Sequence, residues 1–380
     1  MSSKTKHIMI VAGEVSGDIH AASLVRELKH LDPSLTFSGL GGMHLAQEGV
    51  QLYEDLTKMA VIGFVEVIKH FWELRRLFYL FLEYAVALKP AVVILVDYPG
   101  FNLRLAKALK KHGIKVIYYV SPQIWAWKEK RIELIKKVTD RMLVFFDFEK
   151  EFYEERGMYV DFVGHPLIDH IHINTSRHDL LASKGLNPNN PTIGIIPGSR
   201  DKEIETLLPA MVEAAGIIMQ RIPNVQFLLT KAANISIVKI NKHVLNRNIP
   251  IAVIENEFHN TIHACDICMV TSGTATLETA LLEKPMVIVY KTSWITYMIG
   301  RLLVKIKWIG LANIISQKDI VPECIQAQAT GPAIAHKLLE LYTDPFKMET
   351  TINELKEVKK KLGGSGASRR AAEIVMKEIS

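Results

Sequence analysis

Short apolar runs alternate with longer amphipathic segments along nearly the whole chain. The apolar runs, rich in β-branched and aromatic residues, predict strands. They lie at residues 7–12, 91–97, 115–120, 141–146, 160–164, 192–197, 225–230, 250–255, 266–271 and 285–290. Segments with helical spacing of apolar positions lie between them. This alternation is typical of βαβ units, so the expected fold class is α/β with parallel sheets covered by helices.

The two halves of the chain open in the same way. A strand, a glycine-containing loop and a helix occur in "IMIVAGEVSGDIHAASLVREL" and again, about half the chain later, in "TIGIIPGSRDKEIETLLPAMVEA". We therefore predict two Rossmann-like domains, residues 1–165 and 190–360, that face a central cleft. Residues 361–380 predict a terminal helix that could pack back across the seam. A length of 380 residues, more than one core usually fills, agrees with two domains.

Composition and charge narrow the class of protein only partly. With 49% hydrophobic and 23% charged residues, the chain has enough apolar material for large cores, which excludes disorder. The net charge of +6 suits a phosphate-bearing ligand, an anionic membrane surface or nucleic acid, and selects none of them.

We identify neither a signal peptide nor a membrane-spanning segment in the sequence. The start of the chain lacks the pattern of a signal peptide, and no apolar run reaches the 18 or so residues of a spanning helix, so we expect a cytoplasmic protein.

Cys265 and Cys268 form a single C-x-x-C near His259 and His263. We interpret them as buried free cysteines, with a metal or redox site as the alternative.

Ligands of open α/β sheets bind beyond the carboxyl ends of the strands, so the loops there are the candidate sites. The first loop, "AGEVSGD", contains Glu14, Ser16, Gly17 and Asp18 but no G-x-G-x-x-G, and its acids would repel a pyrophosphate. We expect it to approach a hydroxyl-bearing acceptor. The alternative is that Ser16 or Asp18 only caps the helix.

Two loops of the second half suit a nucleoside diphosphate. In "PGSRDKE", Gly198, Ser199 and Arg200 offer close backbone approach and donors, although Arg200 could equally form a salt-bridged first turn. In "VTSGTATLE", small residues expose helix N–H groups to an anion, and Glu278 can accept hydrogen bonds from ribose hydroxyls. The alternative for the second loop is a capped helix with a solvated glutamate.

Candidate chemistry in the first half centres on Asp97. It follows the strand of residues 91–97 directly, where partial burial would raise its pKa and suit it as a general base. A helix cap or ion pair is the alternative. Trp125 and Trp127 in "SPQIWAWKEKR" could line a sugar-stacking wall or simply pack in the core. His165 in "VGHP" could be a ligand-facing hinge or a core histidine.

Taken together in order and spacing, several motifs resemble lipid-A-disaccharide synthase, an inverting glycosyltransferase family of GT-B architecture. They are "VAGEVSGD", "VDYPGFN", "YVSPQIWAWKEKR", "FVGHPLID", "IPGSR", "SGTATLE", "GLANII" and "VPECIQ". The resemblance covers nearly the whole chain. It implies transfer of 2,3-diacylglucosamine from UDP to the 6-hydroxyl of 2,3-diacylglucosamine 1-phosphate, with inversion and release of UDP, in lipid A biosynthesis.

The resemblance also implies roles for individual residues. Asp97 is the implied base. The implied UDP-binding residues are Arg200, Ser272, Gly273, Thr274, Ala275, Thr276, Glu278, Asn313 and Gln326. Gly198 and Ser199 join this predicted site from their place in the loop before Arg200. Asn313 and Gln326 rest on the resemblance alone. The local sequence departs from the family pattern at Ser316, Gln317 and Cys324. No metal and no cofactor are implied, because the UDP-sugar is a substrate.

Acylated substrates require an apolar surface near an anionic membrane, and we expect peripheral association with the inner face of the bacterial inner membrane. Two aromatic and basic segments could supply that surface, or else pack in the core or against a second subunit of a homodimer. The residues concerned are Phe64, Phe71, Trp72, Phe78, Phe81, Arg301, Lys305 and Lys307. Nucleic acid is not an expected partner.

Two rival functions fit the same pattern less fully. A non-hydrolysing UDP-sugar 2-epimerase would use the same architecture and a comparable UDP site but needs no acyl surface. A peripheral membrane protein that binds acylated lipids without turnover would need no base at Asp97.

Overall fold

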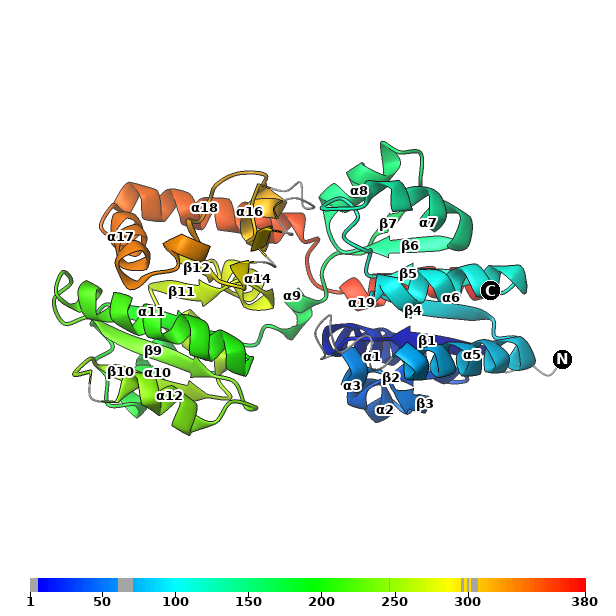
Figure 1. Ribbon diagram of the computed structural model, residues 1–380, viewed down its shortest axis with the longest axis horizontal. Coiled ribbons are helices and arrows are strands. Elements are labelled where there is room, and N and C mark those ends of the chain that lie inside the picture. Colours follow the sequence, from blue (N-terminus) through cyan, green and yellow to red (C-terminus); the bar gives the residue numbers. More distant parts are fainter. Residues whose placement is uncertain (1–5, 61–70, 246, 295–296, 299–300, 302–306) are drawn as a thin grey trace. The chain divides into compact units, whose positions relative to one another are not determined.

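The computed structural model describes residues 6–60, 71–245, 247–294, 297–298, 301 and 307–380. The chain divides into two compact units. Unit 1 comprises Met1–Asp169 together with Leu362–Ser380, and unit 2 comprises His170–Lys361. In Figure 1 the red C-terminal helix accordingly lies among the blue and cyan elements of unit 1.

Unit 1 is built on a parallel sheet of seven strands in the order β3-β2-β1-β4-β5-β6-β7. The strands are β1 (His7–Ala12), β2 (Thr36–Gly41), β3 (Gln51–Asp55), β4 (Val92–Val96), β5 (Val116–Tyr119), β6 (Arg141–Val144) and β7 (Asp161–Phe162). In register, Ala12 lies beside Val96, and Val96 beside Tyr119. The loops that follow β1, β4 and β5 therefore begin at one edge of the sheet.

Helices cover the sheet of unit 1. They are α1 (Val15–Leu31), α2 (Met43–Gln47), α3 (Thr57–Ala60), α5 (Phe71–Leu88), α6 (Pro99–Lys111), α7 (Ile132–Val138), α8 (Asp147–Glu154), α9 (Leu167–His170, crossing into unit 2) and α19 (Ala367–Ile379), with a 3-10 turn at Glu129–Arg131. The C-terminal helix α19 packs against α1, and its Glu378 accepts a hydrogen bond of 2.7 Å from Arg141 at the start of β6. A distant part of the sequence thus completes unit 1.

Unit 2 repeats the design with a parallel sheet of six strands in the order β10-β9-β8-β11-β12-β13. The strands are β8 (Thr192–Ile196), β9 (Gln226–Lys231), β10 (Ile251–Glu255), β11 (Ile267–Thr271), β12 (Met286–Tyr290) and β13 (Glu323–Ile325). The helices are α10 (Arg177–Ser183), α11 (Asp201–Met219), α12 (Ile237–Val244), α13 (Phe258–Ala264), α14 (Thr274–Leu281), α16 (Leu311–Ser316), α17 (Gly331–Tyr342) and α18 (Pro345–Lys361), with a 3-10 turn at Gln326–Gln328.

The burial of the central strands explains why the α/β fold could be predicted from the sequence. Every residue of β4, β5, β8 and β11 is buried, as expected of parallel strands covered on both faces, and this produces the continuous apolar runs of the sequence. Three strands were not predicted: β2, β3 and β13. β2 reads "TFSGLG", β3 reads "QLYED" at a sheet edge, and β13 has only three residues. None of these strands forms an apolar run.

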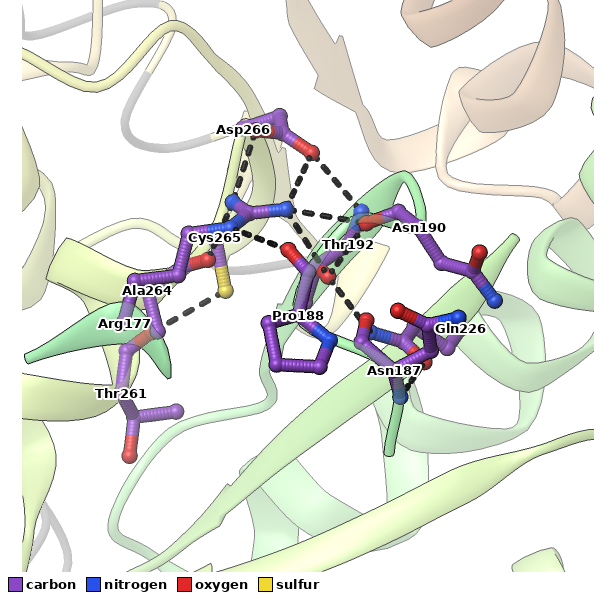
Figure 2. Close-up of polar contacts among 10 residues, drawn as sticks. All are labelled: Arg177, Asn187, Pro188, Asn190, Thr192, Gln226, Thr261, Ala264, Cys265 and Asp266. Carbon is purple, nitrogen blue, oxygen red and sulfur yellow. Dashed lines mark hydrogen bonds and ion pairs between the residues drawn. The ribbon is translucent and has the colours of Figure 1, made fainter. Parts of the chain in front are cut away.

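A polar cluster fixes the end of unit 2 where the strands begin (Figure 2). The guanidinium of Arg177 on α10 donates to both carboxylate oxygens of Asp266, at 2.8 and 3.2 Å. It also donates to the backbone carbonyls of Ala264 and Asn190 at 2.6 and 2.9 Å. Asp266 in turn accepts the backbone N–H of Thr192 at 2.8 Å. This cluster ties α10 to the starts of β8 and β11.

The cysteines lie in the core of unit 2. Cys265, Cys268 and Cys324 are free and buried, and Cys265 Sγ donates to the carbonyl of Thr261 at 3.1 Å (Figure 2). Among the described residues, no three His, Cys, Asp or Glu side chains are grouped as metal ligands would be. The described residues also include no helix that is both long enough and apolar enough to cross a bilayer.

Candidate functional site

A cavity of about 540 Å³ opens in unit 2 at the carboxyl ends of its strands. It is lined by the ends of β8, β9, β10 and β11 and by the loops that follow them. Of the residues predicted to bind UDP, eight line this cavity: Gly198, Ser199, Arg200, Ser272, Gly273, Thr274, Ala275 and Glu278. The two glycine-containing loops of the second half therefore lie around one site, as parallel strand ends require.

The start of α14 offers backbone donors to this cavity. Gly273 has a φ of 155° and precedes Thr274, the first residue of the helix. The first N–H groups of a helix lack intrahelical partners and favour an anion through the helix dipole. The hydroxyl of Thr271, buried at the end of β11, makes no hydrogen bond within the described residues. An unpartnered buried hydroxyl beside a helix start is suited to a phosphate oxygen.

The loop before α11 differs from this arrangement. The carboxylate of Glu203 accepts the backbone N–H groups of Ser199 and Arg200 at 3.0 and 3.2 Å, so these donors are already used. The side chain of Arg200 is 82% exposed and pairs with Glu203 at 2.8 Å. The salt-bridged first turn is therefore present. Gly198, with a φ of 106°, is required because a Cβ would lie 2.3 Å from the Glu203 carboxylate.

Three predicted UDP-binding residues lie outside the cavity lining. Thr276 is buried, and its hydroxyl donates to the carbonyl of Gly273 at 2.7 Å. Asn313 is also buried: its amide donates to Val321 and Glu323, and its oxygen accepts the N–H groups of Ile320 and Val321. All four hydrogen-bond positions of Asn313 are thus occupied by protein groups.

Gln326 has a similar structural role. Its amide exchanges two hydrogen bonds with the backbone of Thr292, at 2.7 and 3.0 Å. The role of Asn313 and Gln326 as further UDP-binding positions stays a prediction. Both residues order the loops that surround α16 and β13.

The cavity lining includes residues that sequence reasoning missed. Lys231, at the end of β9, is buried and contacts Glu255 at 2.6 Å. His259 on α13 lies 3.1 Å from Glu278, Nε2 to Oε1, and both side chains are 18% exposed. Lys231 follows an apolar run and could have been noticed as a strand-end cation. His259 was noted only as a neighbour of the C-x-x-C, and its place at Glu278 follows from tertiary packing that brings α13 beside α14.

In unit 1, the residue at the end of β4 has an unusual backbone. Asp97 and Tyr98 both have φ of 46°, in the left-handed region that costs non-glycine residues on the order of 1 kcal/mol or more each. Three hydrogen bonds hold this geometry. The Asp97 N–H donates to Tyr119, and its carbonyl accepts the Tyr118 hydroxyl at 2.6 Å and the Asn102 amide at 2.8 Å.

The electrostatic environment of Asp97 suits a base. Burial raises the pKa of its carboxyl from 3.8 to about 7, and the nearby negative charge of Glu14 adds to the shift. A hydrogen bond from the Tyr98 backbone N–H opposes it. A general base is most effective when its pKa is near the working pH. Asp97 therefore has the properties predicted from its position after the strand.

The loop after β1 separates into exposed and structural residues. Glu14 and Ser16 are exposed at the start of α1, and Gly17 is buried. Asp18 is buried as well, and its carboxylate accepts the backbone N–H groups of Gly42 at 2.7 Å and His44 at 2.9 Å. Asp18 thus caps α2, a helix distant in sequence, which corrects its expected place among the acceptor-facing residues.

The motif residues Trp125, Trp127 and His165 have different surroundings. Trp125 is partly exposed and donates its indole N–H to Glu149 at 3.2 Å. Trp127 has Lys128 over its ring at 4.0 Å. His165 is 8% exposed, and its Nδ1 accepts the Leu167 N–H at 3.1 Å. Of the two interpretations of His165, the structure supports the core histidine.

Some of the expected membrane-contact residues are exposed, and others are buried. Phe71 and Trp72 on α5 are 48% and 71% exposed, whereas Phe78 packs against the core. Phe81 is fully buried, which corrects its expected place on a contact surface. Arg301 and Lys307 are exposed, and Lys307 pairs with Asp319. Phe64 and Lys305 lie outside the described residues.

Solved structures resemble the fold over its whole length. A glycosyltransferase of kitacinnamycin covers all of this chain with a TM-score of 0.67 at 14% identity, and all of that chain is covered. A UDP-GlcNAc 2-epimerase from Neisseria meningitidis, bound to UDP-GlcNAc, covers 98% of this chain and 100% of its own, with a TM-score of 0.66 at 15% identity. These similarities confirm the two-domain GT-B fold class and, at such identity, show the fold alone.

Sequence relatives are far more similar. A lipid-A-disaccharide synthase of Geobacter sulfurreducens is 42% identical over 380 residues, which cover 100% of this chain and 99% of that protein. Lipid-A-disaccharide synthase 1 of Legionella pneumophila is 43% identical over 373 residues, covering 98% and 97%. A family model described as lipid-A-disaccharide synthetase matches residues 8–379. The chain therefore belongs to the lipid-A-disaccharide synthetase family.

Proposed function

We propose that the protein joins UDP-2,3-diacylglucosamine to 2,3-diacylglucosamine 1-phosphate, forming the β-1,6-linked disaccharide 1-phosphate of lipid A and UDP. Membership of the family supports this reaction, because the family is named for its disaccharide product. The structural observation that carries the proposal is the Asp97 carboxyl, held in a strained turn at a strand end with a pKa of about 7.

Unit 2 would bind the donor. In the cavity, the helix start at Gly273–Ala275 and the Thr271 hydroxyl would contact the diphosphate. Lys231 and Arg200 would supply positive charge, and Glu278 would accept hydrogen bonds from the ribose hydroxyls. Arg200 would have to exchange its contact with Glu203 for the ligand. Its high exposure supports this, since an exposed ion pair contributes little, about 0–1 kcal/mol.

Unit 1 would supply the base. Asp97 would take the proton of the acceptor 6-hydroxyl as that oxygen forms a bond with the anomeric carbon on the face opposite UDP. The bond from the anomeric carbon to the phosphate oxygen breaks, and its electron pair leaves with UDP. General base catalysis of this kind contributes about 10²–10⁴-fold to the rate. Cationic and backbone N–H groups of the protein would stabilise the departing diphosphate.

The acyl chains and the membrane would meet the exposed aromatic surface of α5. Phe71, Trp72 and Tyr79 are exposed there, and the Arg75 guanidinium lies 5.6 Å from the Trp72 ring and 5.8 Å from the Tyr79 ring. Exposed aromatic rings beside arginines favour an anionic lipid interface. We place the protein at the inner face of the bacterial inner membrane. A homodimer is the alternative use of this surface, and the molar mass in solution distinguishes them.

The proposal is tested by incubating the protein with UDP-diacylglucosamine and diacylglucosamine 1-phosphate. Mass spectrometry should find the disaccharide 1-phosphate, with UDP in equal amount. The Asp97→Asn variant should form both products on the order of 10³-fold more slowly. Absence of the disaccharide with the unaltered protein would reject the proposal. The 2-epimerase is not favoured by the relatives, and incubation with UDP-GlcNAc alone should leave the sugar unchanged.

A further inference from the structure

Glu149 on α8 is a buried carboxylate that takes no part in the proposed proton transfer. Its side chain is 3% exposed. One oxygen, Oε2, accepts the backbone N–H groups of Phe145 and Phe146 at 3.2 and 3.3 Å. The other, Oε1, accepts the indole N–H of Trp125 at 3.2 Å. The two oxygens therefore serve different elements.

Capping of α8 explains only the first oxygen. Glu149 occupies the third position of its helix, from which a glutamate commonly accepts the N–H groups before the helix. Glu203 does the same at the start of α11 with a side chain that remains 22% exposed. Full burial is thus unnecessary for the cap. Burial of a carboxylate is costly even when it is hydrogen-bonded, so the burial of Glu149 against Trp125 requires a reason beyond capping.

The contact holds the "SPQIWAW" loop in place. This loop follows β5, whose Tyr119 lies beside Val96 at the end of β4. Helix α8 reaches the loop at two points: Glu149 binds Trp125, and the Tyr153 hydroxyl lies 2.9 Å from the Ser121 hydroxyl. The Phe148 ring meets the Trp125 ring edge to face, with centroids 5.0 Å apart. Trp125 is therefore held by a hydrogen bond and a ring contact from α8, and the residue remains partly exposed.

Glu149 also interacts with Asp97. Burial raises the pKa of Glu149 to about 7, the hydrogen bonds from Phe146, Trp125 and Phe145 oppose this, and the charge of Asp97 adds to it. The other titratable groups around the pair are Glu14 and Tyr98 beside Asp97, Tyr118 against its carbonyl, Tyr153 beside Glu149, and Arg131 near Tyr118. The negative charge of Asp97 therefore disfavours ionisation of Glu149.

We propose that Glu149 is a positioning residue for the acceptor sugar: its carboxylate fixes the Trp125 indole as a stacking surface at the sheet edge that carries Asp97. The inference rests on the proposed function, because it concerns the acceptor of that reaction. A sugar ring packs well against an aromatic face, and a fixed ring loses less freedom on binding than a mobile one.

The first test needs no substrate. Trp125 fluorescence is isolated as the difference between the unaltered protein and Trp125→Phe, and it is titrated with acid and base. We expect a transition near pH 7 as Glu149 ionises. The transition should vanish in Glu149→Gln and should move to lower pH in Asp97→Asn, where the charge that raises the pKa of Glu149 is absent. Asp18→Asn, which alters another buried capping carboxylate of unit 1, should leave the transition unchanged.

The second test is kinetic. Glu149→Ala and Trp125→Phe should each raise the KM for the acceptor, by on the order of tenfold for the loss of one hydrogen bond to a charged group, with the KM for the UDP-sugar unchanged. Trp125→Phe keeps an aromatic ring and tests the contact if Glu149→Ala folds poorly. The double variant should be no worse than Glu149→Ala, since both changes break the same contact.

The two proposals fail in different ways. A fluorescence transition that persists in Glu149→Gln, or equal effects on both KM values, would overturn the role of Glu149 even if the disaccharide is formed. If the unaltered protein forms no disaccharide, the proposed function fails, and the role in acceptor binding falls with it. The fluorescence titration would still report whether Glu149 holds Trp125.

Discussion

At the scale of single residues, Asp97 combines strain with an altered pKa. Its left-handed backbone is stabilised by hydrogen bonds from Tyr118 and Asn102, which come from a strand and a helix that flank the turn. The carboxyl has a pKa of 3.8 in ordinary surroundings and about 7 here. Because the folded state binds this proton more tightly, the contribution of Asp97 to the free energy of unfolding decreases as pH rises from about 4 to about 7.

Asp97→Asn should therefore separate activity from stability. We expect kcat to fall by on the order of 10³-fold, because the proposed base is lost. At pH 8 the melting temperature should rise by a few degrees, because the amide carries no buried charge, whereas at pH 4 the two proteins should melt alike. In the unaltered protein, kcat/KM should increase with pH up to about 7 as Asp97 loses its proton. A lower melting temperature of the variant at pH 8 would contradict the burial of this charge.

His259 should tune the binding of ribose. Its contact with Glu278 orients the carboxylate that faces the cavity. His259→Ala should weaken UDP binding about fivefold and reduce the preference for UDP over 2′-deoxy-UDP, both measured by calorimetry. His263→Ala, on the same helix but outside the cavity lining, is the matched control. An unchanged preference between the two nucleotides would show that His259 does not act on Glu278.

At the scale of elements, the two ends of the strands in unit 2 have different roles. The carboxyl ends form the cavity, whereas the amino ends of β8 and β11 are joined by Arg177 and Asp266 (Figure 2). The planar guanidinium satisfies several acceptors at once, which a lysine cannot do. The fold of unit 2 is thus stabilised at the edge remote from its chemistry.

Arg177→Ala should lower the free energy of unfolding by about 2 kcal/mol, since the carboxylate of Asp266 and three backbone carbonyls lose the guanidinium as their donor. Arg177→Lys should recover part of this loss. Urea denaturation provides the measurement. Arg369→Ala, which breaks exposed pairs with Glu27 and Glu373, should change little. Equal stability of the Arg177 and Arg369 variants would refute the structural role of the cluster.

Helix α5 should contribute to membrane association through its exposed face. We expect Phe71→Ser with Trp72→Ser to reduce cosedimentation with vesicles of anionic phospholipid several-fold, because the apolar area that enters the interface is removed. Phe346→Ser, which removes an aromatic ring that is 78% exposed on α18, is the control. Retention of full vesicle binding by the double variant would place the contact elsewhere.

At the scale of the whole molecule, the chain ends in the unit in which it began. Helix α19 packs on α1 and buries Ala367, Ala371, Ala372 and Val375 completely. Its Glu378 also contacts Lys115 and Arg141 at the starts of β5 and β6. The last helix is therefore part of the core of unit 1, although nearly two hundred residues of unit 2 precede it in the sequence.

Truncation of the chain after residue 366 should lower the thermal stability of unit 1 selectively. Removing the buried face of α19 should cost unit 1 roughly 3 kcal/mol or more, so its calorimetric transition should move to lower temperature while that of unit 2 stays in place. Deleting Ser380 alone should have no effect. A uniform shift of both transitions would show that the helix stabilises the molecule as a whole.

The sequence determined the fold class, the family and the positions at which chemistry could occur. Buried parallel strands need continuous apolar runs, and loops at their carboxyl ends must carry the polar groups, so β4 with Asp97 and the loop before α14 were visible as patterns. Only the tertiary structure decided how those groups are used. It paired His259 with Glu278 and Glu149 with Trp125, and it gave Asp18 and Asn313 to loop capping. The physical reason is that a side chain's partners, burial and pKa depend on residues far along the chain, which local periodicity does not encode.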